Sequence, residues 1–258
     1  MIPTRLLPLL TLPLASAACT REGLLAAAAS YVSAITSGKL TSLPLSTSNF
    51  TYLENNKKAD HTKAAYLSSG LKVDLTRSTA DTVECASYTL IISASGTKPY
   101  ILATQLRHPP DGNTSTIALV DTIAATTGSL FFNAKKTLDY IQKQSWAVIP
   151  EGQRASREFL KKYGDGYLDM WTDKNAATSM EWGADCERVE GSQFTKPCGV
   201  SLPRGGSAKN NGMRRYVIDE SIGSVDVLCS FDSLGSLPDS HEIRVEGGKV
   251  KYVHTVTV

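Results

Sequence analysis

The stretch His241-Glu-Ile-Arg-Val-Glu-Gly-Gly-Lys-Val-Lys-Tyr-Val-His254, near the C-terminus, is the part of this 258-residue chain that most clearly indicates a fold. Polar and apolar residues alternate on both sides of Gly247-Gly248, which is typical of two antiparallel strands joined by a two-residue turn. With those glycines as the turn, facing residues share one side of the sheet because side chains alternate along a strand. The expected pairs on that side are Val245 with Val250, Ile243 with Tyr252, and His241 with His254.

The expected pair of His241 and His254 contains two of the four histidines in the chain. Metal binding is one interpretation, but Asp239 is the only further ligand at a suitable spacing, so no metal site is predicted. A second interpretation is a pair of hydrogen-bonding or acid–base groups at the floor of a pocket. A third is two core histidines whose nitrogens are satisfied by neighbouring groups. The second interpretation is our working hypothesis, and the third stays open.

Helix and strand signals occur twice along the chain, at a spacing of about 130 residues, which indicates an internal duplication. The order of helices before strands favours an α+β fold in which helices pack on a curved antiparallel sheet. We expect one half over 18–127 and another over 128–258, with a linking helix over 130–144. The first half is expected to contain helices over 20–37 and 57–67 and strands over 71–77, 82–93, 100–107 and 116–126. The second half is expected to contain a helix over 153–172, a loop-rich stretch over 182–211 and strands over 214–219, 225–231, 241–245 and 250–258.

The first seventeen residues have the features of a cleaved signal peptide. Arg5 supplies a short basic start, residues 6–14 form an apolar core, and Ala15-Ser16-Ala17 resembles a cleavage site. We therefore expect a protein of the secretory pathway that acts outside the cell. Asn49 and Asn113 begin glycosylation acceptor motifs, which would be used if their loops are exposed.

A secretory destination permits disulfides, and the chain has five cysteines. Cys186 and Cys198 flank a loop that contains glycine and proline, and they form the first expected bridge. Cys19 with Cys85 is the second expected bridge, although spacing alone does not fix connectivity. Cys229 shares strand parity with apolar neighbours and is expected to be a buried free thiol.

Several other residues are candidates for a pocket in the second half. Tyr216 shares the parity of Ile218, and a buried tyrosine hydroxyl needs a partner. Trp182 and Arg188 lie in the segment tied by the expected Cys186 bridge, which would cover such a pocket. For each of them ordinary packing is an equally open interpretation. The remaining candidates are the helix residues Tyr163 and Tyr167 and the strand residues Ile243 and Tyr252.

Composition and motifs argue against several classes of function. The net charge is +2, with charges of both signs interspersed, so nucleic acid is not an expected partner. No apolar run is long enough for a membrane span. The sequence contains no G-x-S-x-G elbow, no P-loop and no G-x-G-x-x-G motif. We therefore expect no nucleotide, flavin or nicotinamide cofactor.

The second half resembles a family of secreted fungal proteins classed as a domain of unknown function. The resemblance is carried by Trp182-Gly-x-x-Cys186-x-Arg188-x-Glu190-Gly191, then Cys198, Arg214-Arg-Tyr-Val-Ile-Asp-Glu220, Pro238-Asp-Ser-His-Glu-Ile-Arg-Val245 and Tyr252-Val-His-Thr255. It implies tandem cone-shaped units of the nuclear-transport-factor-2-like, or SnoaL-like, fold. Members of the family include hetero-Diels–Alderases of tropolone–sesquiterpenoid biosynthesis. These join an ortho-quinone methide of polyketide origin to a humulene-type alkene.

That implied activity suits the candidate residues. A cycloaddition needs an apolar cavity that orients two reactants, and it gains from donors placed on the heterodiene oxygen. His241, His254 and Tyr216 are the catalytic candidates for this task, with hydrophobic small molecules as partners and no cofactor. The alternatives are a secreted binding module without turnover and an acid–base dehydratase or isomerase that uses the histidines. By analogy with other cone folds, a homodimer is also expected.

Overall fold

The computed structural model describes residues 19–258, so the expected signal peptide lies outside the described residues. Among these residues, helix α1 (Arg21–Ser37) is the first regular element, close to the predicted 20–37. The Thr20 side chain accepts a hydrogen bond from the Gly23 amide at its start, and Gly38 ends it in the left-handed conformation.

The first unit, residues 21–126, contains one six-stranded sheet in the order β2-β1-β6-β5-β4-β3. The predicted helix over 57–67 is wrong, because this segment is divided among a short edge strand and two single helical turns. The elements after α1 are η1 (Leu40–Ser42), β1 (Thr51–Glu54), β2 (Lys57–Lys58), η2 (His61–Lys63), α2 (Ala65–Ser68), β3 (Leu75–Asp81), β4 (Ala86–Ser93), β5 (Tyr100–Arg107) and β6 (Leu119–Thr126).

The second unit, residues 157–257, repeats this arrangement with its sheet in the order β8-β7-β12-β11-β10-β9. The linking helix α3 (Ala134–Ile141) is shorter than the predicted 130–144. The stretch predicted to be loop-rich contains two strands, β7 and β8. The elements that follow α3 along the chain are η3 (Glu151–Gln153), α4 (Arg157–Asp169), η4 (Ala176–Ser179), β7 (Trp182–Glu190), β8 (Gln193–Thr195), β9 (Gly212–Asp219), β10 (Ser224–Phe231), η5 (Asp232–Leu234), β11 (Leu237–Glu246) and β12 (Lys249–Thr257).

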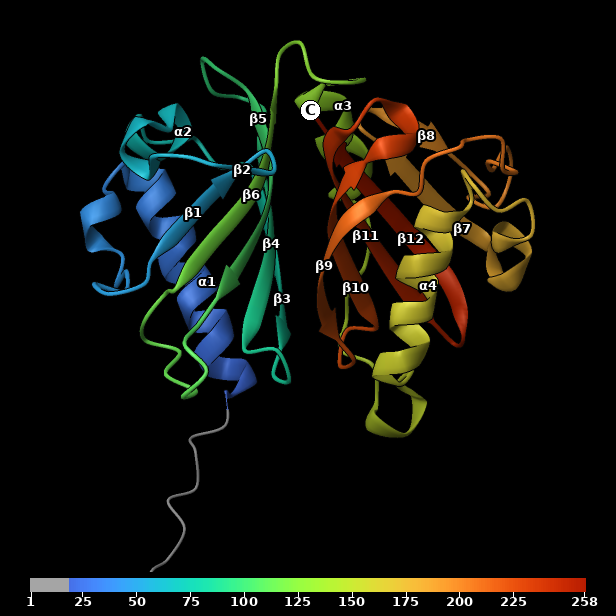
Figure 1. Cartoon of the computed structure of the whole chain (residues 1–258), viewed down its shortest axis with the longest axis horizontal. Coiled ribbons are helices and arrows are strands. Elements are labelled where there is room, and N and C mark those ends of the chain that lie inside the picture. Colours follow the sequence, from blue (N-terminus) through green and yellow to red (C-terminus); the bar gives the residue numbers. More distant parts are fainter. Residues whose placement is uncertain (1–18) are drawn as a thin grey trace, which may run out of the picture.

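Both sheets are mixed, which corrects the prediction of antiparallel sheets. β1 runs parallel to β6, and β7 runs parallel to β12, while the other neighbours are antiparallel. In Figure 1, α1 and α4 cover the outer faces of the two sheets, and the inner faces meet at the middle of the molecule. Apolar side chains of both sheets form one core between them, including Ile123 and Ala103 from the first and Leu228 and Val256 from the second.

The two units contact each other through a reciprocal pair of ion pairs. Arg21 opens α1 and lies 2.9 Å from Asp219 at the end of β9, while Arg157 opens α4 and lies 2.6 Å from Asp81 at the end of β3. Each aspartate also accepts a backbone hydrogen bond from the other unit, from Ala80 or from Ile218. Such exchange of equivalent contacts is the pattern of a two-fold symmetric dimer, formed here within one chain.

The hairpin at Gly247-Gly248 forms where the sequence predicts it, but its register differs farther from the turn. Glu246 faces Lys249 and Val245 faces Val250, as expected. Arg244 then faces Tyr252, so Lys251 is an extra residue in a β-bulge. The bulge exchanges the two faces of the strand, so the predicted pairing of His241 with His254 is wrong. His241 faces Thr255, and His254 faces Glu242.

Two disulfides join Cys19 to Cys85 and Cys186 to Cys198, which confirms both expected bridges. Cys229 is a buried free thiol, also as expected. Disulfides form and persist in oxidising compartments, so the pair is consistent with secretion. Within residues 19–258, no helix combines the length and apolar character needed to cross a bilayer.

Candidate functional site

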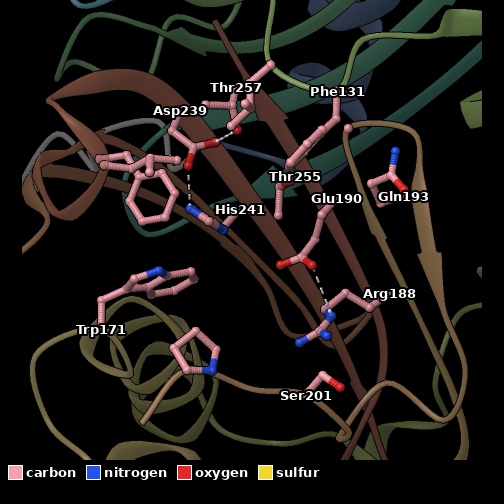
Figure 2. A pocket seen from close by; sticks show the side chains of 15 residues that line it. Phe131, Trp171, Arg188, Glu190, Gln193, Ser201, Asp239, His241, Thr255 and Thr257 are labelled. Carbon is pink, nitrogen blue, oxygen red and sulfur yellow. Dashed lines mark hydrogen bonds and ion pairs between the residues drawn. The ribbon is translucent and has the colours of Figure 1, made fainter. Parts of the chain in front are cut away.

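A pocket of about 240 Å³ lies in the second unit, beyond the C-terminal end of α4. Its walls come from β7, β11, β12 and the segments around Phe131 and Ser201 (Figure 2). Two residues of this rim, Phe131 and Ser201, have positive φ angles of 50° and 53°. Such conformations are uncommon outside glycine and often occur at functional sites. The side chains that give the pocket its chemistry are Trp171, Arg188, Glu190, Phe231, Asp239 and His241.

Asp239 and His241 form a buried dyad at this pocket. They lie two residues apart on β11 and so point to the same face. The Nε2 atom of His241 is 2.7 Å from Oδ2 of Asp239, and the two residues are 1% and 0% exposed. The hydroxyl of Thr257 donates a hydrogen bond of 3.0 Å to the other Asp239 oxygen and fixes that carboxylate (Figure 2).

The dyad is incompletely satisfied. The close contact between His241 and Asp239 is poorly aligned for a hydrogen bond, and neither ring nitrogen has another partner among residues 19–258. Buried polar atoms without partners are rare in native proteins and call for an explanation. His241 lines the pocket, so a bound ligand would contact its ring.

Aromatic rings surround the histidine. The ring centre of His241 lies 5.2 Å from Tyr167, 5.6 Å from Phe231 and 6.3 Å from Trp171. Burial raises the pKa of Asp239, and the contact with His241 opposes that rise. In these apolar surroundings, a proton transfer or a polarised hydrogen bond has a stronger effect than in water.

Arg188 and Glu190 form the opposite wall on β7. The Nε atom of Arg188 is 3.3 Å from a Glu190 oxygen, and Nη2 donates a 3.0 Å hydrogen bond to the Val200 carbonyl. Tyr167 donates a 2.8 Å hydrogen bond to the other oxygen of Glu190. Desolvation, followed by the Glu190 charge, raises the pKa of Tyr167 well above its ordinary value, so its hydroxyl keeps its proton.

Cys229 lies directly across from Asp239 on the neighbouring strand. Its sulfur, a carboxylate oxygen of Asp239 and a nitrogen of His241 are all within 4.8 Å of one another. These atom types at this spacing are able to hold a divalent metal. Desolvation raises the pKa of the Cys229 thiol, which keeps it protonated unless a cation is bound.

The sequence-predicted residues divide between the pocket and the surrounding structure. His241 and Arg188 line the pocket, and Tyr167 supports both walls. Tyr252 and His254 are on the opposite face of the sheet, where both pack against Trp146. Neither therefore reaches the pocket.

The remaining candidates have structural contacts. Tyr216 donates a 2.6 Å hydrogen bond to Asp165 on α4, and Tyr163 donates to the Gly248 carbonyl at 2.9 Å. Trp182 donates to the Ala177 carbonyl, and Ile243 packs in the core beneath α4. Asn49 and Asn113 are both exposed, which meets the condition stated for glycosylation.

Sequence reasoning missed Trp171, Phe231 and Glu190 as pocket residues, and it considered Asp239 only as a metal ligand. The spacing Asp239-x-His241 was the available signal, because residues two apart on a strand share a face. The bulge at Lys251 left no comparable signal. Without the bulge, the sequence predicts that His241 faces His254. In the structure, the partner of His241 at the pocket is Asp239 instead.

The equivalent position in the first unit lacks the dyad. Thr104 on β5 faces Thr122 on β6, just as His241 on β11 faces Thr255 on β12. Leu102, two residues earlier, therefore takes the place of Asp239. Tyr31 on α1 fills the space over Thr104, with 3.4 Å between their hydroxyl oxygens. This acid–base pair is thus confined to the second unit.

Residues 153–257 match a family described as a domain of unknown function (DUF8021). The match covers less than half of the chain but contains α4, all strands of the second sheet and nearly all of the pocket. No curated protein matches the chain.

Proposed function

We propose that this protein catalyses an acid–base reaction on an oxygenated, largely apolar small molecule bound beside Asp239 and His241. The observation that carries the proposal is a buried histidine whose Nε2 lies 2.7 Å from a carboxylate oxygen and whose Nδ1 has no hydrogen-bond partner among residues 19–258. A carboxylate at one ring nitrogen orients the imidazole and leaves the other nitrogen to exchange a proton with a ligand. Aromatic rings around it favour an apolar ligand body.

The specific reaction that we propose is the formation and capture of an ortho-quinone methide. His241, protonated at Nδ1, gives that proton to the departing hydroxyl of a hydroxymethyl precursor, and the ring hydroxyl returns a proton to Nδ1, so that one water is lost and the imidazole keeps its proton. The same imidazole then donates a hydrogen bond to the heterodiene oxygen, where negative charge grows during addition to an alkene. In this proposal the chain acts as a hetero-Diels–Alderase, the activity of the enzymes that its sequence resembles. We also propose that each unit has the cone-shaped nuclear-transport-factor-2-like form. The same proposal holds that the protein is secreted and glycosylated.

The pocket size limits how two reactants would bind. A volume of about 240 Å³ is below the range of about 300–1,000 Å³ that is usual for ligand sites. We therefore place the oxygenated reactant inside and the terpene alkene at the mouth. Phe131 and Leu234 line the mouth and are 57% and 47% exposed, so they offer apolar surface there.

The test is turnover of a hydroxymethyl tropolone with humulenol by the purified protein. We expect faster adduct formation and a single stereoisomer, and His241→Gln should lower the rate by about 10²–10⁴-fold, as expected for loss of a general acid. His254→Gln is the matched control, because the same change on the opposite face of the hairpin should leave the adduct ratio unchanged. Adducts identical in ratio to the uncatalysed mixture would overturn the pericyclic proposal.

Two further outcomes are informative. Saturable binding of the tropolone without turnover would favour the alternative of a binding module. A divalent metal in elemental analysis, lost together with activity on chelation, would instead assign Cys229, Asp239 and His241 as its ligands. In that case His241 could not act as the proton donor.

A further inference from the structure

A second hollow occurs in the first unit at the place that corresponds to the pocket of the second unit. It has a volume of about 890 Å³ and lies along the β1–β2 hairpin, the start of β5 and the end of β6, with Pro238 and Val258 of the second unit also lining it. The pocket lies along the equivalent strands β7, β8, β11 and β12, but the hollow is lined by Tyr100 at the start of β5 and not by the counterparts of Asp239 and His241. We name this hollow the lysine groove, after Lys57, Lys58, Lys63 and Lys98, which line it.

The lysine groove has an apolar and aromatic floor. Tyr66, Tyr100 and Ala124 line it and belong to the core of the first unit. The acid–base pair has no counterpart here, since Thr104 and Leu102 stand at the equivalent positions. The groove therefore has the form of a binding site without the groups that carry the proposed reaction.

The charges around the groove are predominantly positive. Two acidic residues also line it, so the four lysines leave an excess of positive charge. Glu54 accepts a 2.5 Å hydrogen bond from the Tyr52 hydroxyl, and Asp60 accepts from Thr62 and lies 3.7 Å from Lys63. Lys57, Lys58 and Lys98 have no ion-pair partner among residues 19–258. Like charges gathered around a concave surface attract an anion.

We infer that the lysine groove binds an anionic small molecule with a flat apolar ring, such as an aromatic carboxylate. Its ring would lie on the tyrosine and alanine floor, and its charge would meet the lysine rim. The Nζ atom of Lys98 already lies 5.2 Å from the ring centre of Tyr100, so cation and aromatic surface are adjacent.

The experiment compares 2-naphthoate with the neutral 2-naphthol in calorimetric titrations of the full-length mature protein. We expect 2-naphthoate to bind in a saturable way and to weaken as salt is raised, because exposed charges are screened. 2-Naphthol should bind about tenfold more weakly or worse, since it lacks the charge-assisted contacts. The double variant Lys58→Glu/Lys98→Glu should lose binding of 2-naphthoate by a similar factor.

Matched variants separate this site from general electrostatics and from the pocket. Lys135→Glu/Lys249→Glu makes the same change in net charge at exposed lysines elsewhere, and it should bind 2-naphthoate as the wild type does. His241→Gln should also bind it normally. Undetectable binding, equal binding of 2-naphthol, or loss of binding in either control variant would overturn the inference.

Discussion

His254 shows how one side chain can be well placed for a task other than catalysis. It accepts a 3.1 Å hydrogen bond from Arg77 at Nδ1 and donates one of 2.7 Å to Gln144 at Nε2, which suits the neutral ring. Glu242 lies 3.5 Å from Nδ1 and forms an ion pair with Arg77 of the first unit. His254 therefore helps to join the units, and its conspicuous place in the sequence reflects that role.

This environment predicts a pH-dependent stability. Burial lowers the pKa of His254, Arg77 lowers it further, and the carboxylates Glu242 and Glu187 oppose the shift. Because the unfolded histidine titrates near a pH of about 6.5, the folded state loses stability as pH falls below that value. We expect the free energy of unfolding to fall by up to about 1.4 kcal/mol per pH unit between about pH 6.5 and the lower, folded-state pKa.

Urea unfolding of the wild type and His254→Gln at several pH values measures this effect. The variant should show a shallower decline, although not a flat one. His108 is also buried with a lowered pKa and contributes in the same direction. Glu242, whose pKa is lowered, contributes only under more acidic conditions. An equal slope in both proteins would remove His254 as the cause.

At the scale of elements, α4 depends on a close approach to the sheet beneath it. Gly164 faces β10, and a Cβ atom there would lie 3.0 Å from Val227 Cγ2 and 3.1 Å from Val225 Cγ2. From the sequence alone, the expected effect of this glycine is to weaken the helix, because glycine has a low helix propensity. In the structure it allows α4 to lie close to β10.

Gly164→Ala should therefore lower the stability by about 1–3 kcal/mol, because overpacking outweighs the gain in helix propensity. Gly166→Ala is the matched control on the same helix, since its Cβ would meet mainly the flexible Met180 side chain. Thermal unfolding should show a clear drop in Tm for the first variant and little change for the second. A stabilised Gly164→Ala would mean that the helix can move outward without cost.

The elements that sequence predicts well are those whose signals are local. The cap at Thr20 and the stop at Gly38 define α1, and β5 has the bounds expected for it. The candidate site was predicted less completely, because its geometry depends on one extra residue, Lys251, with no distinctive chemistry. β7 was missed because its pairing with β12 is parallel and interrupted, so no simple alternation marks it. The register of β11 with β12 and the pairing of β7 with β12 both depend on residues that are distant in the sequence, which local patterns do not reveal.

At the scale of the whole molecule, the reciprocal ion pairs link the ends of the two helices to the opposite sheets. The carboxylates of Asp81 and Asp219 are almost fully buried, while Arg157 and Arg21 keep 22% and 29% of their side-chain exposure. Removing an arginine leaves a buried, unpaired charge. The inner sheet faces are also occupied within the chain, so a second copy could not pair through them.

Arg21→Ala and Arg157→Ala should each lower the free energy of unfolding by about 2–4 kcal/mol, less than for a fully enclosed pair because the arginines retain solvent contact. The two losses should be similar, since the contacts are equivalent. Lys135→Ala removes an exposed ion pair with Asp139 and should cost less than about 0.5 kcal/mol. Chemical denaturation measures all three, and strongly unequal losses for the two arginines would contradict the equivalence.

The equivalence of the two units within one chain has a genetic consequence. In a dimer of identical chains, one codon specifies both copies of every site, so a substitution that improves one copy is imposed on the other. Here the histidine of one sheet and the threonine at its counterpart have separate codons. Each sheet is free to acquire its own ligand, while a single translation product guarantees that the two are made together in equal amounts.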